Sequence, residues 1–165
     1  MEKIASFTVN HDTLEKGMYI SRIDGDVITY DIRMKKPNGG DYFCMSAAHT
    51  LEHLFATYAR NSQHGNAIVY VGPMGCQTGF YLLVQNADNN QVRRLVTEIL
   101  KSIIEYEGEV FGSSEIECGN INNLSSLVEL SEDVRIDSVE HINSSMTHTG
   151  LNDHRVFHFF LVVIL

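Results

Sequence analysis

The sequence has no excess of basic residues. Its 165 residues include 12 lysines and arginines against 21 aspartates and glutamates, and its formal net charge at pH 7 is −9. A protein that binds nucleic acid needs a basic patch to replace the counterions of the phosphates. The composition therefore argues against a nucleic-acid partner, and the acidic balance is typical of a surface that keeps a protein soluble.

Long hydrophobic runs are also missing. The longest apolar segment, residues 157–165, contains His158 and is far too short to span a bilayer. The initial segment, MEKIASFTVNHD, has no apolar stretch of signal-peptide length. We therefore expect no membrane partner and a cytoplasmic location.

Cysteine is scarce. Cys44, Cys76 and Cys118 are odd in number and far apart, which argues against a disulfide framework and favours reduced thiols. No internal repeat, low-complexity tract or linker divides the chain. Its length suits one domain with a hydrophobic core, over residues 1–165.

Strands and helices are both predicted. Residues 1–35 are predicted to be β-rich, with strands at 6–9 and 27–34 and a turn at 24–26, and two further strands are expected at 67–71 and 80–84. A helix is predicted over 46–60 with Ser46 as its N-cap, and a short one near 124–130. A third, over 91–107, carries an apolar stripe of Val92, Leu95, Val96, Ile99, Leu100 and Ile103.

Asp31 and Arg33 fall on one face of the strand predicted at 27–34, because side chains alternate along a strand. A solvated outer face is the favoured interpretation of this pair. The alternative is a face that lines a pocket.

The most informative segment is His49-Thr50-Leu51-Glu52-His53. Residues four apart lie on the same face of a helix, so His49 and His53 can offer two imidazoles to one metal ion. Glu52 lies beside that face, within reach of a ligand of the metal. By analogy with the H-E-x-x-H motif, we interpret the segment as part of a metal site.

A catalytic metal site usually has three protein ligands, and spacing alone leaves the third one open. The candidates are Cys118, Cys76, Glu115, Glu117 and the other histidines. Two histidines with a cysteine would suit zinc or ferrous iron. Cys76 lies in a glycine-rich turn between two predicted strands, so it is also a candidate for catalysis, although most free cysteines are inert.

The order H-x-x-E-H is the inverzincin signature, in which two histidines and a later glutamate hold zinc and the internal glutamate activates water. In this chain it predicts a peptidase with Glu52 as the base and a downstream glutamate, such as Glu129, as the third ligand. A metal-binding module without enzymatic activity is a further alternative.

A more extensive resemblance covers about residues 6–120. It rests on six blocks in order: Ser6-Phe7 with His11, Asp31-Ile32-Arg33, Pro37-Asn38, HTLEHL at 49–54, GPMGCQTGFY at 72–81, and Cys118-Gly119. Here the chain resembles the S-ribosylhomocysteine lyase (LuxS) family, in which these blocks occur in the same order. Residues 121–165 depart from the family pattern.

This resemblance implies a fold and a metal site. The fold is α+β, with an antiparallel β-sheet packed by helices on one side. In the family, the residues that match His49, His53 and Cys118 hold one divalent metal ion, which is natively Fe²⁺ and can be replaced by Zn²⁺ or Co²⁺.

The resemblance also implies a reaction. Glu52 and Cys76 match the acid–base pair of the family, and Ser6, His11 and Arg33 match residues that bind the substrate. The family cleaves the thioether of S-ribosylhomocysteine by carbonyl shifts and β-elimination, which yields homocysteine and the dihydroxypentanedione precursor of an autoinducer signal. The family enzyme is a homodimer with its sites at the subunit interface.

Overall fold

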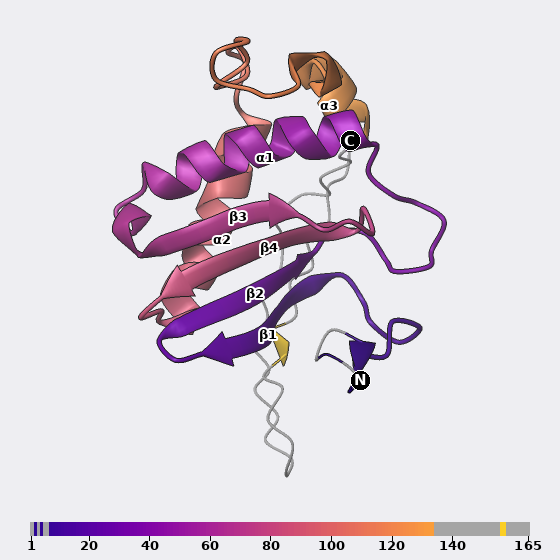
Figure 1. Ribbon diagram of the computed structural model, residues 1–165, viewed down its shortest axis with the longest axis vertical. Coiled ribbons are helices and arrows are strands. Elements are labelled where there is room, and N and C mark those ends of the chain that lie inside the picture. The colour runs from indigo at the N-terminus through magenta and orange to yellow at the C-terminus, as the bar shows by residue number, and fades with distance from the viewer. Residues whose placement is uncertain (1, 3, 5–6, 134–155, 158–165) are drawn as a thin grey trace.

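A single antiparallel β-sheet forms the centre of the computed structural model, which describes residues 2, 4, 7–133 and 156–157. Within these residues the sheet has five strands in the order β3-β4-β2-β1-β5, and every neighbouring pair is antiparallel (Figure 1). The strands are β1 (Gly17–Asp24), β2 (Val27–Arg33), β3 (Ile68–Pro73), β4 (Gly79–Gln85) and β5 (Val156–Phe157).

Within the described residues, the helices leave one face of the sheet uncovered. Helix α2 lies behind the sheet and α1 runs along the β3 edge, where it packs on β3 and α2 (Figure 1). This arrangement confirms the expected α+β fold with helices on one side. The helices are α1 (Met45–Arg60), α2 (Asn89–Ile104) and α3 (Leu127–Asp133), with short 3₁₀ helices η2 (Gly65–Ala67) and η3 (Ile121–Asn123).

The predicted strand at 27–34 is confirmed as β2, and the turn before it contains Gly25 with a φ of +63°. The strand predicted at 6–9 is wrong over its described residues. There the Phe7 N–H donates to the Ile4 carbonyl at 2.9 Å, so the chain turns instead of extending. β-branched and aromatic residues favour a strand only where a neighbouring strand can pair with them, and here β1 occupies the place beside β2.

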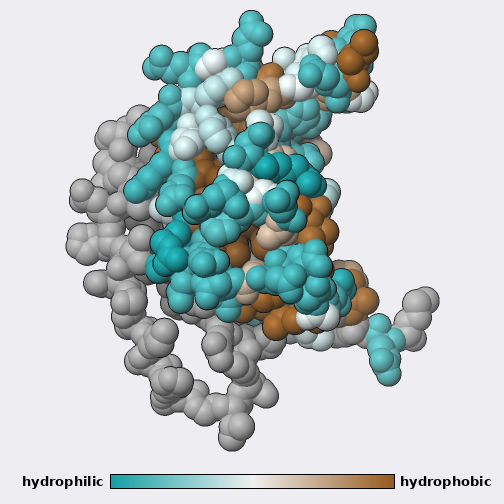
Figure 2. Space-filling model, turned by 90° about the vertical axis from the view of Figure 1, so that its left-hand side faces the viewer, coloured by the Kyte–Doolittle hydropathy of each residue, from teal (hydrophilic) through white to brown (hydrophobic). Residues whose placement is uncertain are grey.

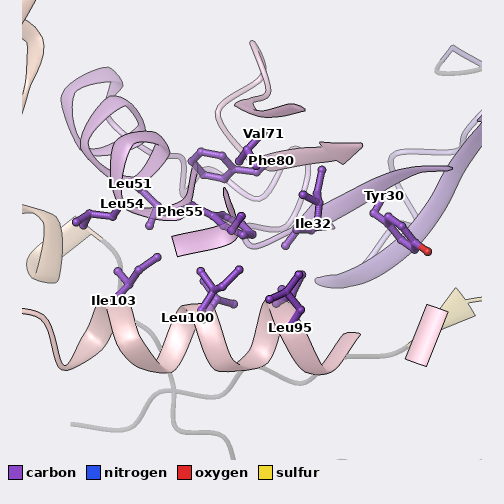
Figure 3. Close-up of a cluster of buried hydrophobic side chains, with 14 of the residues drawn as sticks. Tyr30, Ile32, Leu51, Leu54, Phe55, Val71, Phe80, Leu95, Leu100 and Ile103 are labelled. Carbon is purple, nitrogen blue, oxygen red and sulfur yellow. The ribbon is translucent and has the colours of Figure 1, made fainter. Parts of the chain in front are cut away.

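The core lies between the sheet and the two long helices (Figure 3). All six residues of the predicted apolar stripe on α2 are buried, and Leu95, Leu100 and Ile103 point from α2 toward the sheet. Leu51, Leu54 and Phe55 of α1 join the same core. One face of α1 is therefore held by apolar packing, which fixes the direction of its remaining side chains.

Hydrophilic residues cover most of the described surface in the view of Figure 2, and hydrophobic residues gather along its right-hand edge. That edge is the front of Figure 1, where none of the described helices lies on the sheet. No helix within the described residues is long and apolar enough to cross a membrane. In the apolar segment 157–165, Phe157 belongs to β5 and pairs with Met18 of β1, and residues 158–165 lie outside the described part.

Candidate metal centre and the neighbouring cysteine

His49, His53 and Cys118 come together although Cys118 lies 65 positions after His53 in the chain. Their ligand atoms all lie within 4.8 Å of one another. The Nε2 atoms of the two histidines are 3.1 Å apart, and Cys118 Sγ is 3.6 Å from His49 Nε2. The structure thus brings together the three residues that the resemblance assigns to the metal.

Helix α1 places the two imidazoles. His49 and His53 are one helical turn apart, and their ring centroids are 4.7 Å apart at an interplanar angle of 81°. The expected N-cap Ser46 is wrong, because the helix begins one residue earlier and Cys44 caps it. The Cys44 sulfur accepts a hydrogen bond from the Ala47 N–H at 3.4 Å.

Backbone carbonyls orient both rings. His49 Nδ1 donates to the Asn123 carbonyl at 2.9 Å, and His53 Nδ1 donates to the Phe111 carbonyl at 2.7 Å. With Nδ1 protonated, each neutral ring presents the lone pair of Nε2 toward Cys118. A carbonyl that accepts from the outer nitrogen is the usual partner of a metal-binding histidine.

The segments that carry these carbonyls are themselves fixed on α1. Gly112, with a φ of +66°, turns the chain directly after Phe111. The Thr50 hydroxyl donates to the Ser125 carbonyl at 3.0 Å and accepts from the Ser125 N–H at 2.9 Å. Cys118 is buried in a turn that the Ser114 carbonyl closes at 2.9 Å from the Cys118 N–H.

The glutamates considered for the third ligand are hydrogen-bonded elsewhere or exposed, and the histidines from His141 onward lie outside the described residues. Glu129 accepts from the backbone N–H and the hydroxyl of Ser126, at 2.8 and 3.1 Å, in a capping box at the start of α3. Glu117 accepts from the Ser114 hydroxyl at 2.5 Å, and Glu115 is exposed. Among the described residues, Cys118 alone completes a three-residue group with the histidines.

This donor set fits a divalent metal ion. Two neutral imidazoles and one thiolate suit zinc or ferrous iron, and three protein ligands leave a position open for substrate. The side chain of Glu52 is half-buried beside the cluster. Within the described part of the chain its carboxylate has no hydrogen-bond or ion-pair partner, so it is available to exchange a proton with a bound molecule.

A second polar cluster surrounds Cys76, and here the expected solvated outer face of β2 is wrong. Arg33 is 4% and Asp31 9% exposed. Arg33 donates to Asp31 through Nε at 3.1 Å and Nη2 at 2.5 Å, to the Thr78 hydroxyl at 2.5 Å, and to Cys76 Sγ at 3.5 Å. Alternation predicted which side chains share a face but not that the turn of Cys76 covers that face.

The environment of Cys76 favours its thiolate. Partial burial raises the pKa of the thiol. Hydrogen bonds from the Thr78 hydroxyl and backbone, together with the charge of Arg33, lower this pKa by a larger amount, so its net shift is downward. Cys76 is also exposed to solvent. An exposed thiolate can act on a molecule outside the chain.

The remaining predicted site residues are placed in part. Ser6 lies outside the described residues. His11 donates from Nδ1 to the Val9 carbonyl at 3.0 Å, and its charge contributes to lowering the pKa of Asp31, whose burial raises it more strongly. The sequence interpretation missed Thr78, although it lies inside the glycine-rich block. The Phe111 and Asn123 carbonyls that orient the two histidines could not be recognised from the sequence, because every residue has a backbone carbonyl.

Comparison with known proteins places the chain in a family. A sequence model of the family described as S-Ribosylhomocysteinase (LuxS) matches residues 4–148, which include part of the segment beyond residue 120. A protein of Clostridium acetobutylicum named S-ribosylhomocysteine lyase is 49% identical over 126 residues, which are 73% of this chain and 80% of the relative.

Two further relatives carry the same name. The protein of Desulfotalea psychrophila is 43% identical over 126 residues, covering 73% of this chain and 79% of the relative. That of Finegoldia magna is 41% identical over 129 residues, covering 75% of this chain and 82% of the relative. With its family match and its His-His-Cys cluster, the chain belongs to the S-ribosylhomocysteinase (LuxS) family.

Proposed function

We propose that this protein is a metal-dependent carbon–sulfur lyase. It cleaves the thioether of S-ribosylhomocysteine to homocysteine and 4,5-dihydroxy-2,3-pentanedione. The observation that carries the proposal is the convergence of His49, His53 and Cys118 in a chain of this family. The half-buried Glu52 beside them and the activated Cys76 supply the acid–base groups that the reaction needs.

The reaction requires two kinds of proton transfer. Moving a carbonyl along a sugar chain removes a proton from the carbon next to the carbonyl and delivers one to a neighbouring atom. A metal held by His49, His53 and Cys118 would supply Lewis-acid polarisation of a substrate oxygen. No redox cofactor is needed, because each shift is an isomerisation.

Cys76 and Glu52 share these proton transfers. The Cys76 thiolate takes the proton from carbon, and Glu52 exchanges a proton at the adjacent oxygen. Once the carbonyl lies two carbons from the sulfur, loss of a further proton from the intervening carbon expels homocysteine as a thiolate by β-elimination. The thiolate then takes up a proton, and the enol that remains tautomerises to 4,5-dihydroxy-2,3-pentanedione.

Ser6, His11 and Arg33 complete the proposal as residues that bind the substrate. Arg33 supports this role through its position beside Cys76, where its positive charge attracts the carboxylate of the substrate. The proposal extends to Fe²⁺ as the native metal, to a homodimer with sites at the interface and to a cytoplasmic location. Metal analysis after anaerobic purification and light scattering of the purified protein test the first two.

The decisive assay measures free thiol released from S-ribosylhomocysteine by the metal-loaded protein. We expect Cys76→Ala and Glu52→Gln to reduce the release by at least about a hundredfold, as is usual for the loss of an acid–base group. Cys44→Ser is the matched control, because it changes an exposed cysteine outside both clusters and keeps a side chain that can cap α1. Wild-type protein that holds metal and releases no thiol would exclude this function.

The third ligand separates the lyase from the inverzincin alternative. We expect Cys118→Ser to lose metal and Glu129→Gln to retain it, because Glu129 caps α3. Metal content after dialysis against a weak chelator measures both. The reverse pattern would favour a peptidase.

A further inference from the structure

Thr78 lies between Cys76 and its charged partner, Arg33. Its side chain is buried, and its hydroxyl oxygen lies 3.0 Å from Cys76 Sγ and 2.5 Å from Arg33 Nη1. A buried hydroxyl with two polar neighbours has a defined orientation once the role of each neighbour is known.

The guanidinium decides that orientation. Arg33 can only donate, so the Thr78 oxygen accepts from it. The single hydroxyl hydrogen of Thr78 is then free to point at the Cys76 sulfur. Arg33 is itself fixed, because both oxygens of Asp31 accept from it. Asp31 therefore holds Arg33, Arg33 donates to the Thr78 oxygen, and the Thr78 hydroxyl donates to the Cys76 sulfur.

The backbone holds Thr78 in this place independently of its side chain. The Thr78 carbonyl accepts from the N–H groups of Met34 and Lys35, both at 2.9 Å. The turn that carries Cys76 closes with the Met74 N–H donating to the Gly79 carbonyl at 2.8 Å. Removal of the Thr78 hydroxyl can thus change the ionisation of the Cys76 thiol without removing the hydrogen bonds that form the turn.

We propose that Thr78 is a positioning residue. Its hydroxyl, oriented by Arg33, donates a hydrogen bond to Cys76, which stabilises the thiolate and fixes the direction of its sulfur. This rests on the proposed function only for the use of that thiolate. Within the described part of the chain, the other titratable groups that interact with the cluster are Tyr81 on β4, Tyr19 on β1, and His11, and they are unchanged in the variants below.

The test is the pH dependence of alkylation by iodoacetamide, with Cys76 followed by mass spectrometry of its peptide. Thr78→Val removes the hydroxyl and keeps the shape, and we expect it to raise the midpoint for Cys76 by about one pH unit. That corresponds to about tenfold less thiolate at a pH below both midpoints. Thr78→Ser keeps the hydroxyl, and we expect it to restore the midpoint of the wild-type protein.

Exposed Cys44, in the same samples, is the internal reference, and its alkylation rate should be equal in all variants. If Thr78→Val does not fold, Thr78→Ala and Thr78→Ser provide the same comparison, since they differ only in the hydroxyl. Equal midpoints with and without the hydroxyl would overturn the proposal. Alkylation needs no substrate, so a shifted midpoint supports this role even if the lyase assay fails.

Discussion

At the scale of single residues, the ionisation of Cys76 depends on two opposing effects. Burial raises the pKa of the thiol, and neighbouring hydrogen-bond donors lower it. Burial disfavours a thiolate, but Cys76 is exposed and therefore only partly desolvated. Thr78 and Arg33 contribute hydrogen bonds and a positive charge that favour the ionised form. The donors have the larger effect, and the pKa of Cys76 falls below the ordinary value of a thiol.

The lowered pKa predicts how activity depends on pH. The thiolate is the active form, so kcat/KM should fall as pH decreases through the lowered pKa of Cys76. Arg33→Gln removes a positive charge beside the sulfur and should move this inflection to higher pH. Thiol release measured across a pH series checks both, with metal content as the control. An inflection unmoved by Arg33→Gln would contradict this account of the charge.

At the scale of elements, Gly112 links the 105–120 segment to α1. Its φ of +66° is strained for residues with a side chain, and a Cβ there would lie 3.3 Å from His53 Nδ1. Gly112→Ala should therefore cost about 1–2 kcal/mol and displace the Phe111 carbonyl from His53. We expect metal to leave about tenfold faster, measured by transfer to a chromogenic chelator.

Gly119→Ala is the matched control for this prediction. A Cβ at Gly119 meets nothing within 4 Å, and the residue adjoins Cys118, so the change is equally close to the metal centre. We expect metal loss at the wild-type rate. Equal rates for the two alanine variants would show that Gly112 does not orient His53.

Cys44 is a second element-scale case, because it caps α1. Cys44→Ala removes the acceptor of the Ala47 N–H and should lower the free energy of unfolding by about 1 kcal/mol. Cys44→Ser keeps an acceptor of a preferred capping type and should be at least as stable as the wild-type protein. Urea unfolding measures the difference. A cap without energetic value would leave Cys44→Ala as stable as Cys44→Ser.

These elements also show what sequence can predict. Periodicity predicted both long helices and the pairing of His49 with His53, because each depends on residues close together in the chain. Periodicity could not select Cys118, which lies in an irregular turn, and only the ordered motif blocks assigned it. The burial of Asp31 and Arg33 was missed, because alternation along β2 contains no information about what covers the sheet.

At the scale of the molecule, the candidate metal centre joins α1 to residues 105–126, and these two parts share few regular hydrogen bonds. Residues 105–126 contain only one short 3₁₀ helix, yet the backbone of three of them hydrogen-bonds to side chains of α1. The Phe111 carbonyl meets His53, the Asn123 carbonyl meets His49, and Ser125 meets Thr50. A metal on His49, His53 and Cys118 adds a fourth and stronger connection between the same two parts.

Metal binding should therefore stabilise the folded protein. Metal that binds the native state and not the unfolded chain adds about 2.7 kcal/mol at a free concentration one hundred times the dissociation constant. We expect the midpoint of thermal unfolding to rise with added Zn²⁺ and fall with a chelator, measured by calorimetry. Cys118→Ser should respond much less, and Cys44→Ser should respond as the wild-type protein does. A melting temperature independent of metal in the wild-type protein would mean that these three side chains do not clamp residues 105–126 to α1.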